Sequence, residues 1–261
     1  MWLLLGYLLL GAVAGLMAGV FGLGGGIIIV PALIMTFTYL HFPPEILTHL
    51  AVGTSLACIV FTSLSTIYVH QQKKAIYWPL VLKLSLGMIF GGLLGAYFAD
   101  FMSGELLQRV FSLYAICVAA QMWFSWRPKA QLHLPKTPGC ALIGSLIGCV
   151  SGLFGIAGGS LVVPILALYR VPIKNAIATS AATGFPIALA GAFGYWMMGL
   201  NNALLPEYSQ GYIYWPACLG IILSSTFFAK VGARLAHRLA PEKVQKLFSI
   251  VLVLIAMKLF I

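Results

Sequence analysis

Long runs of apolar residues, separated by short polar connections, dominate the chain. Six runs are about 20 residues long, the length that an α-helix needs to cross the ~30 Å hydrocarbon core of a bilayer. They cover residues 46–69, 78–99, 106–125, 175–198, 214–236 and 244–261. Two further apolar stretches, 2–40 and 139–169, are interrupted by clustered glycines and are predicted to be hairpins of two helical arms. Because lipid offers no partner for open strands, the pattern predicts an all-α polytopic membrane protein with about eight membrane segments.

The same landmarks occur twice in the same order. Residues 19–31 (GVFGLGGGIIIVP) align with residues 152–164 (GLFGIAGGSLVVP), with seven of thirteen positions identical. The pair Thr54-Ser55 then recurs as Thr179-Ser180, and the tripeptide Tyr-Trp-Pro occurs at 77–79 and again at 214–216. The chain is therefore interpreted as a tandem repeat of residues 1–125 and 138–261, joined by a polar linker at 126–137. In each half a glycine-broken hairpin precedes three transmembrane helices.

Composition excludes several classes of protein. Hydrophobic residues make up 61% of the 261 positions and charged residues only 8%, which leaves too few polar residues to cover a soluble domain. The net charge of +10 does not indicate nucleic-acid binding, because the basic residues lie in connections between apolar runs rather than beside stacking aromatics. The five cysteines lie in apolar stretches, so we expect neither a disulfide framework nor a metal site.

The basic residues predict the orientation in the membrane. Thirteen of the fifteen Lys and Arg lie in or beside four sites: Lys73, Lys74, Lys83; Arg127, Lys129, Lys136; Arg170, Lys174; Lys230, Arg234, Arg238, Lys243, Lys246. By the positive-inside rule these sites face the cytoplasm. The stretch 138–169 lies between two of these cytoplasmic sites, so it must enter and leave the membrane on the inner side. By the same count, residues 1–40 enter and leave on the outer side. This parity predicts an inverted-topology repeat with both termini outside, an arrangement common in secondary transporters.

The two glycine clusters are the first candidate binding surfaces. Irregular backbone at membrane depth is tolerated where it is buried in protein or lines a wet cavity, although glycines also serve close helix packing. A new helix is expected to begin near Ile27 and near Ser160, with Pro31 and Pro164 in its first turn. Its free N–H groups and positive dipole end would bind an anion. The candidate residues are Gly24, Gly25, Gly26, Gly158, Gly159 and Ser160, whose hydroxyl would either cap its helix or donate to a ligand.

Thr54, Ser55, Thr179 and Ser180 are the second set of candidate substrate-binding residues. Each hydroxyl can donate one hydrogen bond to a ligand, or can bond the carbonyl four residues earlier in its own helix. Asp and Glu lie only at the ends of the apolar runs. That placement argues against a carboxylate-based cation pathway, and the sequence locates no site for H⁺ or Na⁺ coupling. His49 is interpreted as a residue of the membrane interface. Lys83 and Arg109 would either extend to the interface or draw anions toward the cavity, and the interface is favoured.

The motifs GxxxGxxGxGGG at 15–26 and GxFGxxGGSxxVP at 152–164, each followed by a Thr-Ser helix and a Tyr-Trp-Pro helix start, resemble those of the TauE/SafE family of sulfite exporters. The resemblance extends over essentially the whole chain. It implies a permease for small, mostly sulfur-containing anions such as sulfite, sulfoacetate and other sulfonates. The family's functional residues carry over to Gly22–Gly26, Gly155–Ser160 and the two Thr-Ser pairs. Ala157 stands where the first half has Gly24, so unequal contributions of the two halves are expected.

The sequence thus predicts a secondary transporter of small anions in the cell membrane that works by alternating access around two glycine-rich turns, with no cofactor and no nucleic-acid partner. An anion channel and a non-transporting membrane scaffold are the alternatives. An enzyme is not expected. The best dyad for an intramembrane hydrolase would pair Ser151 with His237, but His237 lies at the cytoplasmic end of its run, and Ser151 aligns with the packing residue Ala18.

Overall fold

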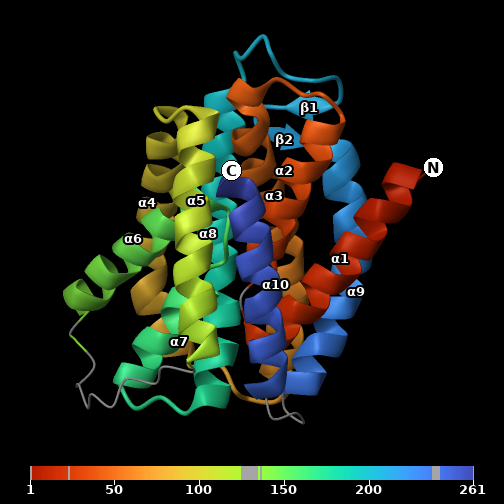
Figure 1. Ribbon diagram of the computed structural model, residues 1–261. Coiled ribbons are helices and arrows are strands. Elements are labelled where there is room, and N and C mark those ends of the chain that lie inside the picture. Colours follow the sequence, from red (N-terminus) through yellow and green to blue (C-terminus); the bar gives the residue numbers. More distant parts are fainter. Residues whose placement is uncertain (1, 23, 125–134, 136, 237–241, 261) are drawn as a thin grey trace.

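The computed structural model describes residues 2–22, 24–124, 135, 137–236 and 242–260. In these ranges the chain folds into a bundle of helices with one short β-ribbon at an end of the bundle (Figure 1). The first half forms α1 (Trp2–Phe21), α2 (Gly26–Tyr39), α3 (Pro44–Gln72), α4 (Trp78–Asp100) and α5 (Gly104–Trp123). The second half forms α6 (Thr137–Phe154), α7 (Gly159–Leu168), α8 (Ile173–Gly199), β1 (Ser209–Gln210), β2 (Ile213–Tyr214), α9 (Trp215–Ala236) and α10 (Glu242–Phe260).

The expected helices are confirmed. Each of the six long apolar runs is one helix, and each glycine-broken stretch is two. Seven of the described helices are long and apolar enough to cross a membrane. The second arms of the hairpins, α2 and α7, are shorter, and so is the apolar stretch Phe248–Phe260 of α10. The β-ribbon between α8 and α9 was not predicted, because two residues per strand leave no detectable alternation. Most of the linker predicted at 126–137 lies outside the described residues.

Prolines and aromatic residues mark where several helices begin. Pro44 lies at the start of α3, and the two Tyr-Trp-Pro tripeptides lie at the starts of α4 and α9, as predicted. A proline there costs no intrahelical hydrogen bond. The indole nitrogen of Trp78 also donates to the side-chain oxygen of Gln71 at 2.7 Å, which ties the start of α4 to the end of α3.

The helices pack mainly across the two halves of the sequence. The long helices α3 and α8 pack against each other, and α1 packs along α9, α4 along α6, and α5 along α10. Each of these four pairs joins a helix of residues 1–125 to a helix of residues 138–261. The halves are therefore interleaved in space, and neither buries its apolar surface without the other.

Rows of glycines allow the closest of these contacts. On α4, Gly87, Gly91 and Gly95 lie against the backbone of α6, and on α6 Gly144, Gly148 and Gly152 lie against the backbone of α4. A Cβ added at any of the six would meet main-chain atoms of the partner helix at less than contact distance. Spacing of small residues by four places them on one helix face, so two backbones approach closely in lipid. Gly11, Gly15 and Gly19 form the matching row on α1, against α9.

The outer faces of the helices are apolar. On α4, Leu82, Leu86 and Phe90 are 60% or more exposed, whereas Leu84 and Met88 on the inner face are buried. A row of exposed large apolar side chains along a 23-residue helix suits contact with hydrocarbon. Together with the seven candidate spans, it makes this chain a multi-pass membrane protein.

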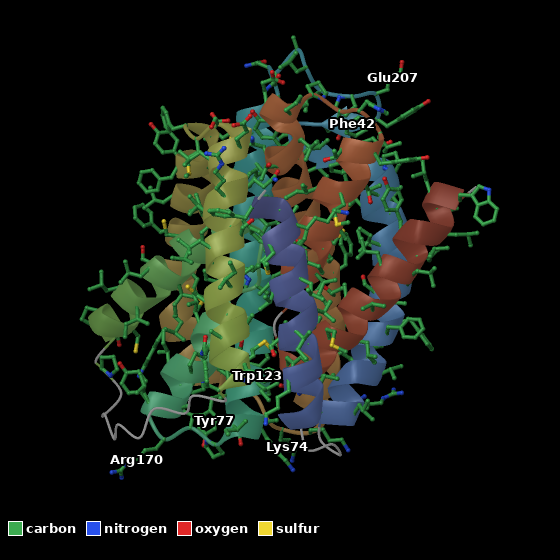
Figure 2. The ribbon with its side chains drawn as sticks, viewed as in Figure 1. Phe42, Lys74, Tyr77, Trp123, Arg170 and Glu207 are labelled. Atoms are coloured by element: carbon green, nitrogen blue, oxygen red, sulfur yellow. The ribbon has the colours of Figure 1, made fainter. Side chains whose placement is uncertain are left out.

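Two basic residues and one acidic residue show how the ends of the bundle differ. Lys74 and Arg170 lie at one end and Glu207 at the other, near Phe42 (Figure 2). The start of α1 and the end of α10 both lie in the half of the molecule that carries the β-ribbon (Figure 1). Of the basic residues used to predict orientation, Arg127, Lys129, Lys136 and Arg238 lie outside the described residues.

Candidate functional site

Two glycine turns interrupt the hairpins. We call residues 22–25, in which Leu23 lies outside the described residues, the first glycine turn, and residues 155–158 the second glycine turn. Gly22, Gly24 and Gly25 in the first and Gly155 and Gly158 in the second have φ between 68 and 79°. This left-handed conformation is costly for residues with a Cβ, so the glycines determine where each helix breaks.

The two turns contact each other inside the bundle. A Cβ added to Gly24 would overlap the Cβ of Ala157, and one added to Gly26 would overlap the carbonyl oxygen of Gly155. Gly184 of α8 also faces Ala157, with its Cβ position 2.9 Å from that methyl group. The two glycine turns, far apart in sequence, are therefore brought together in space.

Each turn leads directly into a helix start. Gly25 and Gly158 are the N-caps of α2 and α7. The amides of Ile28 and Ile29 donate to the carbonyl of Gly25, at 3.0 Å each. Those of Leu161 and Val162 donate to the carbonyl of Gly158, at 2.9 and 2.7 Å. The backbone amides that come earlier in the first turn of each helix have no acceptor within the helix. They also lie at the positive end of the helix dipole.

The two helix prolines lie deeper than expected. Because α2 begins at Gly26 and α7 at Gly159, Pro31 and Pro164 are each the sixth residue of their helix and not part of its first turn. At that position a proline removes the donor that would otherwise bond the carbonyl four residues earlier. These are the carbonyls of Ile27 and Ser160. Each helix start is therefore less tightly bonded than an uninterrupted helix would be.

Ser55 and Ser180 hold the turns of the opposite halves. The Ser55 hydroxyl donates to the Gly155 carbonyl at 2.8 Å, and the Ser180 hydroxyl donates to the Gly22 carbonyl at 3.3 Å. Both serines are fully buried. In this conformation their hydroxyl hydrogens are used within the protein, so the two serines support the glycine turns from α3 and α8.

Thr54 and Thr179 make a second matched pair of contacts. The Thr54 hydroxyl oxygen accepts from the backbone N–H of Tyr214 at 2.9 Å, and that of Thr179 accepts from the N–H of Tyr77 at 3.1 Å. Burial also raises the pKa of the Tyr214 phenol above its ordinary value. Each threonine thus fixes the segment that enters α9 or α4, and it keeps its own hydroxyl hydrogen for another partner.

Ser160 lies beside a residue that the sequence did not single out. Its hydroxyl oxygen lies 2.5 Å from that of Tyr114 on α5, and the N-cap of α7 is Gly158 rather than Ser160. The Tyr114 ring in turn stacks on Phe154, with centroids 4.7 Å apart. Tyr114 had no sequence signal, because the internal repeat aligns it with Val251 and the motifs do not reach α5.

The remaining polar residues near the membrane ends have structural contacts. The imidazole Nε2 of His49, a buried residue, lies 2.9 Å from the carbonyl oxygen of Ala99, and its ring lies 5.2 Å from that of Tyr212. Arg109 forms an exposed ion pair with Glu105 at 4.0 Å, within one helix. His49 therefore packs inside the protein, and the Arg109 side chain is exposed on α5.

The fold and site define a class: an all-helical, multi-pass membrane protein in which two glycine-broken hairpins meet at the centre of the bundle. The sequence matches the family described as Sulfite exporter TauE/SafE over residues 7–259. The chain belongs to this family.

Named relatives match nearly the whole length of the chain. A probable membrane transporter protein of Haemophilus influenzae is 35% identical over 255 residues, which are 97% of each chain. Probable membrane transporter proteins of Methanocaldococcus jannaschii and Bacillus subtilis are each 27% identical, over 94% and 96% of this chain and 91% and 94% of theirs. The family therefore supports a role as a membrane transporter.

Proposed function

We propose that the protein is a secondary transporter of small oxyanions, sulfur-containing ones such as sulfite or sulfonates foremost. The observation that carries the proposal is the meeting of two glycine turns, each followed by a helix start, in the interior of the bundle. Backbone amides at a helix start bind an anion without a cationic side chain. The family description, sulfite exporter, supplies the sulfur oxyanions.

An inverted repeat is the second part of the proposal. Contacts occur in reciprocal pairs. Ser55 contacts the second glycine turn and Ser180 contacts the first. In the same way, α1 packs against α9, and its counterpart α6 packs against α4, the counterpart of α9. Such pairing is what a two-fold axis in the membrane plane would produce. The basic end of the bundle then faces the cytoplasm, and both termini lie outside.

The interleaved packing bears on how alternating access would occur. Because α1 is packed against α9 and α6 against α4 along glycine rows, residues 1–125 cannot move as one body against residues 138–261. The moving bodies would instead each combine helices of both halves: α1 with α9, and α4 with α6. The glycine turns lie where these bodies meet, so their left-handed residues are suited to absorb the change.

Binding is tested first with the purified protein. Thermal unfolding is measured with sulfite, thiosulfate, sulfoacetate, sulfate, acetate and lactate as sodium salts. A ligand of the folded state at 100 times its Kd stabilises by about 2.7 kcal/mol, so a sulfur oxyanion should raise Tm by several degrees. The stabilising anion should also show saturable flux and counterflow in proteoliposomes. Flux without saturation or counterflow would indicate a channel, and no effect of any anion would argue for a scaffold.

Orientation is tested by labelling single cysteines. In a Cys117→Ala background, which removes the exposed native thiol, Lys73→Cys places a thiol next to Lys74, and Glu207→Cys places one at the opposite end of the bundle (Figure 2). Both positions are exposed. A membrane-impermeant maleimide added to intact cells should label Glu207→Cys and leave Lys73→Cys unlabelled until the membrane is opened. The reverse pattern would place the termini inside.

A further inference from the structure

The hydroxyl of Ser151 is an unexplained polar group beside the second glycine turn, and the inference drawn from it rests on the proposed function. Ser151 lies in the last turn of α6 and is 0% exposed. Within the part of the chain that the structure describes, its hydroxyl has no hydrogen-bond partner. A buried hydroxyl without a partner destabilises the fold, and one that adjoins a helix start is a candidate donor to a ligand held there.

The Ser151 hydroxyl is directed at the start of α7. A Cβ built on Gly158, the N-cap of that helix, would lie 3.1 Å from the Ser151 oxygen. The backbone amides of Gly159 and Ser160 come next in the chain. They lie before the amides of Leu161 and Val162, which donate to the Gly158 carbonyl. A hydroxyl donor and a helix start of ten residues therefore adjoin each other in the second glycine turn.

The other serines of the central region have protein partners. Ser55 and Ser180 donate to turn carbonyls, and Ser160 shares a hydrogen bond with Tyr114. In the first half the position that matches Ser151 is Ala18, and there the Cβ position of Gly25 faces the backbone carbonyl of Ala14 at 2.9 Å. A carbonyl would repel an anion where the hydroxyl would attract one. The two glycine turns are thus chemically unequal.

We propose that Ser151 is a substrate-binding residue, and that its hydroxyl donates a hydrogen bond to one oxygen of an oxyanion held at the N-terminus of α7. The second glycine turn holds the anion, and the first closes against it through Gly24 and Ala157. Ser151 is enclosed in the present conformation, so the anion reaches it when α7 separates from α6.

The test compares Ser151→Ala with Ser225→Ala. Ser225 on α9 is a matched control, because it is also 0% exposed and its hydroxyl also lacks a partner in the described part of the chain. It packs through its backbone against Gly15 of α1, away from both turns. For each variant, Tm is measured without anion, and Kd is measured for the member of the set sulfite, thiosulfate and sulfoacetate that stabilises the wild type.

Ser151→Ala should raise Kd roughly 10- to 100-fold, the loss expected for a hydrogen bond to a charged group, while Tm without anion stays equal or rises because a buried unpaired donor is removed. Ser225→Ala should leave Kd unchanged. A lower Tm of Ser151→Ala with an unchanged Kd would assign a structural role and overturn the inference alone. If no anion of the thermal-unfolding series, sulfate, acetate and lactate included, stabilises the wild type, the proposed function itself is overturned.

Discussion

Replacing Gly148 by leucine should abolish recovery of the folded protein. Gly148 lies at the centre of the contact between α4 and α6, where an added Cβ would overlap the Met88 carbonyl and lie 2.9 Å from the Met88 Cα and 3.0 Å from the Gly92 nitrogen. All three are main-chain atoms of α4 and cannot rotate aside. A leucine must push the helices apart along the whole glycine row, which costs more than the ~1–3 kcal/mol of an ordinary overpacked core position.

The measurement is the yield of monodisperse protein after extraction from the membrane, followed by Tm. Gly6→Leu is the matched control, because Gly6 is also a helical glycine but has no atom within 4 Å of its Cβ position in the described structure. That variant should be recovered like the wild type. Equal recovery of Gly148→Leu would mean that α4 and α6 do not pack through their backbones, and the interleaved arrangement of the halves would lose its main support.

Much of the fold could be predicted from the sequence because lipid restricts the possible structures. Apolar runs of about 20 residues can only be helices, and the predicted run 78–99 is the helix Trp78–Asp100. The clustered glycines identified the breaks after Phe21 and Phe154, since few other residues adopt the left-handed backbone found there. The internal repeat predicted which residues correspond, and corresponding residues do make corresponding contacts.

The partners of each helix could not be predicted in the same way. A row such as Gly144, Gly148 and Gly152 shows which face of α6 packs closely, but it carries no information on which helix packs there. For a related reason Tyr114 escaped notice, and Ser151 was considered only as a nucleophile and set aside as a packing position. The repeat matches them with Val251 and Ala18, so neither belongs to a duplicated motif, and only the folded chain places them beside the second glycine turn.

The second large effect is expected from a substitution at the contact between the two glycine turns. Gly24→Ala should lower both Tm and transport severely, for two separable reasons. The residue has a φ of 71°, which costs an alanine about 1–2 kcal/mol. Its new methyl group would also overlap the methyl group of Ala157 across the interface between the turns.

Adding Ala157→Gly separates these two contributions. Removing the opposing methyl group relieves the overlap but not the backbone strain, so the double variant should be more stable than Gly24→Ala alone by about 0.5–3 kcal/mol, the range of coupling between residues in contact. Ala157→Gly alone should be only mildly destabilised and provides the fourth corner of the cycle. Stability from thermal unfolding and the initial rate of anion flux are measured for all four proteins. Strictly additive effects in both would show that the turns do not touch, and a single anion enclosed between them would then be excluded.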